Sequence, residues 1–117
     1  MTTPSMEKSP PELVERFGAV LDRHPDLERR KMFGYPAGFI GGNLATSLFH
    51  DRWVVRLAEP DREELLRLEG AAQFEPMPGR AMKGFALVPP SIVEDDTAID
   101  GWVDRAIAHA RSLPAKK

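Results

Sequence analysis

The fold class is decided by residues 38–58, which read GFIGGNLATSLFHDRWVVRLA. Gly41-Gly42-Asn43 is a tight-turn signal between two runs rich in aromatic and aliphatic residues, and His50-Asp51-Arg52 is a second turn candidate. Beyond it, residues alternate with period 2, as in a strand with one buried face and one wetter face. The buried face should hold Trp53, Val55 and Leu57, and the wetter face Arg52, Val54, Arg56 and Ala58. This stretch predicts an antiparallel meander.

Working outward, we place the meander's strands at Lys31–Tyr35, Gly38–Ile40, Leu44–Phe49 and Trp53–Ala58, the first two either separate or forming one bent strand. A further strand is predicted at Ala81–Val88, where Pro89-Pro90 closes it.

Three helical patterns flank these strands. The first starts at Ser9-Pro10-Pro11-Glu12, where Ser9 is expected to cap the helix and Glu12 to complete a capping box. The second opens at Glu59-Pro60-Asp61 with Asp61 as its cap, buries a leucine stripe and stops at Gly70. The third begins at Asp95-Asp96-Thr97, where acidic residues favour a helix N-terminus, and ends at Pro114. The second helix is expected to turn Leu65, Leu66 and Leu68 inward.

The element order is therefore α-β(3-4)-α-β-α, which predicts an α+β domain with an antiparallel sheet and helices on one face. The chain has 117 residues, the usual size of one domain. We expect a single domain over residues 9–114, with flexible tails at 1–8 and 115–117.

Composition and motifs argue against an enzyme. The chain has no cysteine, which removes thiolate nucleophiles, disulfides and cysteine-bound metal. The three histidines, His24, His50 and His109, do not stand at metal-ligand spacing, and no serine lies in a nucleophile motif. We therefore predict no catalytic residue, no cofactor and no metal. We also predict no membrane partner, because no apolar run approaches the length of about 20 residues that spans a bilayer, and we take a cytoplasmic location as the default.

Basic clusters are the best remaining lead. Three consecutive cations stand next to Met32-Phe33, and two more flank a glycine-containing loop. Basic side chains interleaved with aromatics can contact an anion, a nucleic acid or a partner chain. A nucleic acid is not favoured, because the formal net charge is −2. An ordinary solvated surface is the competing interpretation. The candidate contact residues are Arg29, Arg30, Lys31, Arg80 and Lys83.

The same segments resemble the TfoX/Sxy N-terminal-domain family. The resemblance rests on Arg30-Lys31-Met32-Phe33-Gly34, on the glycine-rich hairpin that follows, and on Asp51–Leu57. Further along, Phe74-Glu75-Pro76 and Met82-Lys83-Gly84-Phe85 fit the same order, as do Trp102, Ala106 and Ala110 in the last helix. It spans about Leu13–Leu113. Tyr35-Pro36-Ala37 stands where the family often has a second glycine, so the local hairpin is expected to differ.

The resemblance implies an α+β fold similar to that of secretion chaperones, and it supplies no catalytic residues. Full-length members that resemble the bacterial competence regulator carry a second, helical domain, for which this chain has no room after Lys117. Two functions stay open. The first is a non-enzymatic regulatory module that binds a protein partner or a second copy of itself. The alternative is an anion, nucleotide or nucleic-acid binding domain that uses the five cations.

Overall fold

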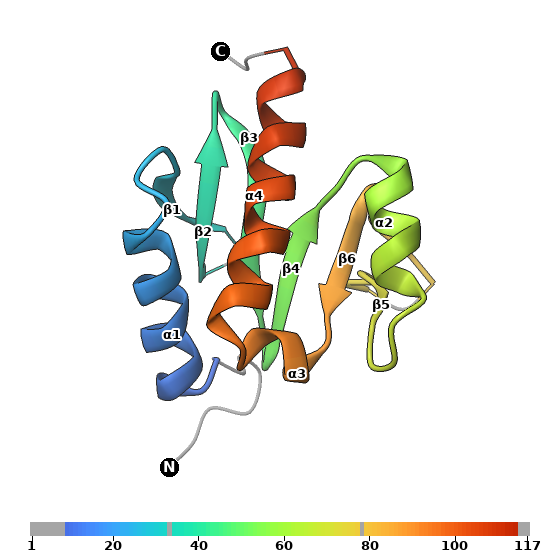
Figure 1. Ribbon diagram of the computed structural model, residues 1–117, viewed down its shortest axis with the longest axis horizontal. Helices are drawn as coiled ribbons and strands as arrows, with labels where there is room; N and C mark the ends of the chain where they lie inside the picture. Colours follow the sequence, from blue (N-terminus) through green and yellow to red (C-terminus); the bar gives the residue numbers. More distant parts are fainter. Residues whose placement is uncertain (1–8, 33, 78, 115–117) are drawn as a thin grey trace.

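A computed structural model describes residues 9–32, 34–77 and 79–114. Its six strands form one antiparallel sheet in the order β1-β2-β3-β4-β6-β5 (Figure 1). The predicted α+β class with an antiparallel sheet is confirmed. The elements are, in chain order, α1 (Pro11–Asp22), β1 (Glu28–Met32), β2 (Tyr35–Ile40), β3 (Asn43–Phe49), β4 (Arg52–Arg56), α2 (Glu59–Leu66), β5 (Ala72–Gln73), β6 (Phe85–Val88), α3 (Pro90–Val93) and α4 (Asp96–Ser112).

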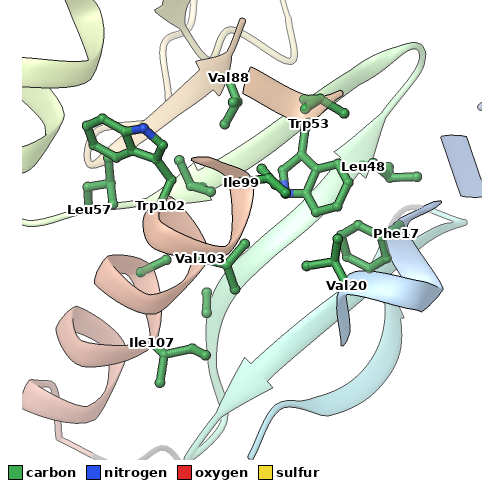
Figure 2. Packing of buried hydrophobic residues seen from close by; sticks show 14 of the residues in the cluster. Phe17, Val20, Leu48, Trp53, Leu57, Val88, Ile99, Trp102, Val103 and Ile107 are labelled. Carbon is green, nitrogen blue, oxygen red and sulfur yellow. The ribbon is translucent and has the colours of Figure 1, made fainter. Parts of the chain in front are cut away.

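The main core lies between the sheet and the two long helices. In Figure 1, α1 and α4 cross the same face of the sheet, while α2 lies beside β6. Figure 2 shows Phe17 of α1 against Trp53 of β4, and their ring centroids are 4.8 Å apart. The fully buried Trp53 donates its indole N–H to Thr46 Oγ1 at 2.8 Å, so its one polar atom is satisfied. Burying such side chains is what holds both helices on the sheet.

The opposite face of the sheet carries a second, smaller cluster. Val54 belongs to it and is fully buried, although the alternation placed it on the wetter face. The cover is the connection between β5 and β6, which presses Phe74 against the ring of Phe49 at 5.1 Å between centroids. A strand pattern cannot reveal such a cover, because it comes from a loop distant in sequence.

The hairpin turns follow the glycines. Gly41 and Gly42 both have positive φ, which suits a two-residue hairpin loop between Ile40 and Asn43. Between β1 and β2, Gly34 has φ 82°. The chain therefore makes two separate strands here, and the bent-strand alternative is wrong. The predicted strand Lys31–Tyr35 is wrong, because the turn between β1 and β2 lies within it: β1 spans Glu28–Met32, and β2 begins at Tyr35, before the predicted Gly38.

Both predicted caps are wrong. Ser9 donates its hydroxyl to the His50 carbonyl, and Pro10 occupies the cap position without a side-chain bond. In α2 the cap is Ala58, again without a side-chain bond, so Asp61 lies inside the first turn. Asp95 does cap α4, because its carboxylate accepts from the Ala98 N–H at 3.1 Å. At Ser9, a contact with a distant segment overrides the short capping motif.

The predicted element order misses two short elements. β5 pairs with β6 through only two residues, and α3 is a single helical turn after Pro89. The strand expected at Ala81–Val88 is only Phe85–Val88. α2 ends at Leu66, before the predicted stop at Gly70; Leu65 is buried and Leu66 partly buried, but Leu68, beyond the helix, is exposed. Phe33, Pro78 and the tails expected at 1–8 and 115–117 lie outside the described residues.

Polar contacts fix α1 against α4. Arg16 pairs with Asp96 at 2.8 Å, and Arg23 makes a forked contact with Asp100 that raises the pKa of the guanidinium. The buried His24 donates Nδ1–H to the Val20 carbonyl at 2.9 Å, while its Nε2 lies 3.0 Å from Asp104 Oδ1. The position of α1 matters because α1 forms one wall of the groove described next. In the described part of the chain, no helix is long and apolar enough to cross a membrane.

Candidate functional site

The three consecutive cations lie on β1, at one edge of the sheet. Successive side chains of a strand point to opposite faces, so the triplet is divided between the two faces. Arg29 reaches the α1 side, where it contacts the Gly18 carbonyl at 3.3 Å and pairs with Asp22. Arg30 lies on the other side, 5.5 Å from the centre of the Phe39 ring. Lys31 returns to the α1 side.

An apolar groove runs between α1 and the β1–β2 hairpin. It consists of two hollows of about 220 and 270 Å³. Both are lined by Val14 and Pro36, so they adjoin each other. Phe17 and Leu21 complete the apolar floor of the first, while Arg29 and Arg30 border it; Lys31 borders the second. We call this the β1 groove.

The cations of the β1 groove are loosely held. Arg29 pairs with Asp22, and Arg30 pairs with Glu28 at 3.0 Å, but the four side chains are between 51% and 72% exposed. Exposed ion pairs contribute only about 0–1 kcal/mol, so a partner's carboxylates can replace them at little cost. Within the described ranges, Lys31 has no ion pair. The groove therefore offers an apolar floor with exchangeable positive charge on its rim.

Arg80 and Lys83 lie elsewhere. Both are exposed and belong to the connection between β5 and β6, at the other end of the sheet order. At the usual strand spacing, the outer strands of a six-stranded sheet lie about 24 Å apart. Lys83 lines a hollow of about 280 Å³ together with Arg62 and Gln73. Arg80 lies in a turn that a bridge to Met77 closes. The five predicted residues therefore form two groups, and only the β1 triplet borders an apolar groove.

A fourth hollow, of about 350 Å³, opens between the start of α1 and α3. Arg16 and Arg52 line it with three carboxylates, Glu12, Asp51 and Glu94. Arg52 donates to the Gly70 carbonyl at 2.9 Å, and its Nε is buried without a hydrogen-bond partner in the described structure. Because that atom is closed to solvent, it is not available to a ligand that enters the hollow. No sequence pattern indicated this hollow.

The histidines lie at three separate places. His24, just after α1, contacts Asp104 of α4. The hydroxyl oxygen of Tyr35 lies 3.2 Å from Nδ1 of His50, at the turn between β3 and β4. His109 on α4 is partly buried, and its pKa is lowered first by that burial and then by the charges of Arg56 and Arg62. Among the described residues, no three histidine or carboxylate side chains come close enough to hold a metal ion.

The fold and the groove together define a small α+β domain with a cationic edge strand, the kind of surface on which other chains dock. The family comparison then gives its membership. The model of the TfoX N-terminal domain matches residues 19–110, and the chain belongs to this family. No curated protein and no solved structure matches the chain. The expected likeness to secretion chaperones accordingly stays a prediction.

Sequence reasoning found the charges of the β1 groove but missed its floor. In the sequence, Val14 belongs to the apolar stripe of the first helix, with Leu13, Phe17, Val20 and Leu21, and Pro36 belongs to the hairpin expected to differ from the family pattern. The sequence does contain one signal: Val14 directly follows Leu13 and so widens the apolar stripe of α1, and in the structure Val14 is 41% exposed. A stripe too wide for the core it covers indicates an apolar surface left for something else.

Proposed function

We propose that this domain is a non-enzymatic interaction module that binds a protein partner through the β1 groove. One observation carries the proposal: an exposed, cationic edge strand lies beside an apolar groove of the same domain. Apolar floor area provides affinity and the charged rim provides orientation and specificity, as in other protein interfaces. We include in the proposal a regulatory role and a cytoplasmic location, as the family resemblance suggests.

The test compares two charge-reversed variants of equal charge. Arg30→Glu with Lys31→Glu reverses two charges of β1, Lys31 on the groove rim and Arg30 on the opposite side of the sheet, and Arg80→Glu with Lys83→Glu makes the same change in the β5–β6 connection. All four side chains are exposed, so both variants should fold. Each variant and the wild type are immobilised separately, and the cellular proteins that each one retains are quantified by mass spectrometry.

We expect a set of proteins that the wild type and the Arg80/Lys83 variant retain and the Arg30/Lys31 variant loses. An identical set on all three proteins would remove the β1 groove as the binding surface. Circular dichroism melting of both variants checks that the loss does not come from unfolding.

Anion binding is the second candidate. It is favoured by the hollow that the two cations Lys83 and Arg62 both line. Pyrophosphate, ATP and a short single-stranded DNA are titrated at two salt concentrations. Binding that weakens steeply with salt and disappears in Lys83→Gln would support this function. Binding that is absent, or insensitive to salt, would end it.

A further inference from the structure

The outer side of β1 is open. β1 pairs with β2 along Glu28 to Met32, and the described chain places no strand on its other side. Four of its five residues are exposed. An edge strand presents a row of free N–H and C=O groups, which is a template for another extended chain.

A second copy of β1 is a poor occupant of this edge. In the antiparallel register that pairs all five residues, Arg30 faces its own copy and Arg29 faces Lys31. Like charges directly opposite each other destabilise a strand pair. The sequence of β1 therefore opposes self-pairing.

An acidic chain paired with β1 would instead bring opposite charges face to face. Side chains of an added strand would stand about 4.5–5.5 Å from those of β1. On the α1 side, carboxylates would face Arg29 and Lys31 beside the apolar floor that Val14 and Pro36 provide. On the far side, a carboxylate would face Arg30. Glu28 is the only acidic residue on β1, and it already pairs with Arg30.

Resting on the proposed function, we infer that the partner of the β1 groove is an acidic, extended segment of another protein that pairs with β1 as a seventh strand. Backbone hydrogen bonds to the edge provide the attachment, and the cations select acidic over basic sequences. The same cations prevent the domain from pairing with itself.

The test uses a defined probe, an acetylated and amidated peptide of seven glutamate and valine residues, ordered so that glutamates stand on both faces of the extended chain. It is titrated into the ¹⁵N-labelled domain, and amide shifts and hydrogen exchange are followed by NMR. We expect the largest shifts, and new exchange protection, within Glu28–Met32. Raising the salt concentration should weaken binding. The Arg30→Glu, Lys31→Glu variant should bind about tenfold more weakly, and the Arg80→Glu, Lys83→Glu variant like the wild type.

Two further probes separate strand pairing from simple charge attraction. The same peptide with N-methylated valines keeps its charge but loses backbone donors, so its binding should be lost. Equal binding of the methylated peptide would overturn the strand model. Tighter binding of single-stranded DNA, or of a lysine–valine peptide, would overturn the acidic-segment assignment.

The two proposals fail in different ways. If the glutamate–valine peptide leaves Glu28–Met32 unshifted while cellular proteins still depend on Arg30 and Lys31, the groove binds a partner but not an acidic strand. If no cellular protein depends on those cations, the proposed function itself is wrong.

Discussion

The two edges of the sheet are protected in different ways. β5 is only two residues long, and the chain leaves it for an irregular connection anchored by Phe74. β1 has five residues and full pairing with β2, but it carries three consecutive cations. Short length and edge charge are both known protections against unwanted strand pairing. They differ in what they leave possible, because a short edge excludes every partner whereas a cationic edge excludes only those of like charge.

The largest expected effect comes from breaking the anchor of the β5 edge. Phe74 follows β5 directly, is 3% exposed and packs against Phe49 and Phe85. Phe74→Ala should reduce the free energy of unfolding by about 3–5 kcal/mol, because it opens a cavity under the sheet. Urea denaturation measures it. Met77→Ala, at an exposed position of the same connection, is the control and should stay within about 0.5 kcal/mol of the wild type. A loss in Phe74→Ala no larger than that of the control would show that the loop does not hold this face.

The anchor of the β1 edge should give a smaller effect. Leu27 precedes β1, is 6% exposed, and packs so closely on Gly38 of β2 that a Cβ there would meet its side chain at 3.2 Å. Leu27→Ala should reduce the free energy of unfolding by an amount near the lower end of about 2–5 kcal/mol, because Leu27 keeps some exposure and a smaller side chain is removed than in Phe74→Ala. Leu68→Ala, the same change at an exposed position, is the matched control in the same urea experiment. Equal losses in the two variants would contradict an anchoring role for Leu27.

The sequence predicted the parts of this fold that local patterns specify. Gly41-Gly42 forced the hairpin, and Asp95 marked the start of α4. Ser9 does not cap α1 because its hydroxyl donates a hydrogen bond to the His50 carbonyl, 41 residues away in the sequence. Val54 looked half-solvated because its cover comes from the distant β5–β6 connection. Each failure has the same physical origin, a contact between segments far apart in sequence.

The candidate site shows the same division. Charge clusters are readable from the sequence, so Arg29, Arg30 and Lys31 were identified. Their neighbours in space were not, because the groove exists only once α1 lies against the β1–β2 hairpin. Spacing also could not reveal that Lys83 lines a hollow with Arg62 of α2, apart from the β1 triplet.

Removing two of the cations of β1 should allow this edge strand to pair with a second copy of the domain. Arg30→Thr with Lys31→Thr keeps a strand-favouring residue at both positions and deletes the like charges that oppose self-pairing. The change in unfolding free energy should stay within about 0.5 kcal/mol, since both side chains are exposed. Size exclusion coupled to light scattering should give a larger molar mass for the variant than for the wild type at the same protein concentration.

The matched control is Arg80→Thr with Lys83→Thr, which makes the same charge change away from β1. It should behave like the wild type. If both variants self-associate alike, lost net charge and not the open strand is responsible. If neither does, the cations of β1 do not guard the edge.

The smallest expected effect tests whether the cations near the Lys83 hollow, among them Arg62, act separately from the cations of β1. Burial, followed by the charges of Arg56 and Arg62, lowers the pKa of His109, and Asp61 opposes them. NMR titration of the His109 ring in Arg62→Gln should show the pKa rising towards its ordinary value, while Arg30→Gln on the far edge should leave it unchanged. Because the folded state binds this proton more weakly than the unfolded state, the contribution to stability is present above the ordinary histidine pKa and is lost as the pH falls through the lowered one. The wild type should therefore lose more stability on acidification than His109→Gln does. Equal shifts in the two arginine variants would mean that the cations act as one field over the whole surface, and the selectivity argued for β1 would then lose its local basis.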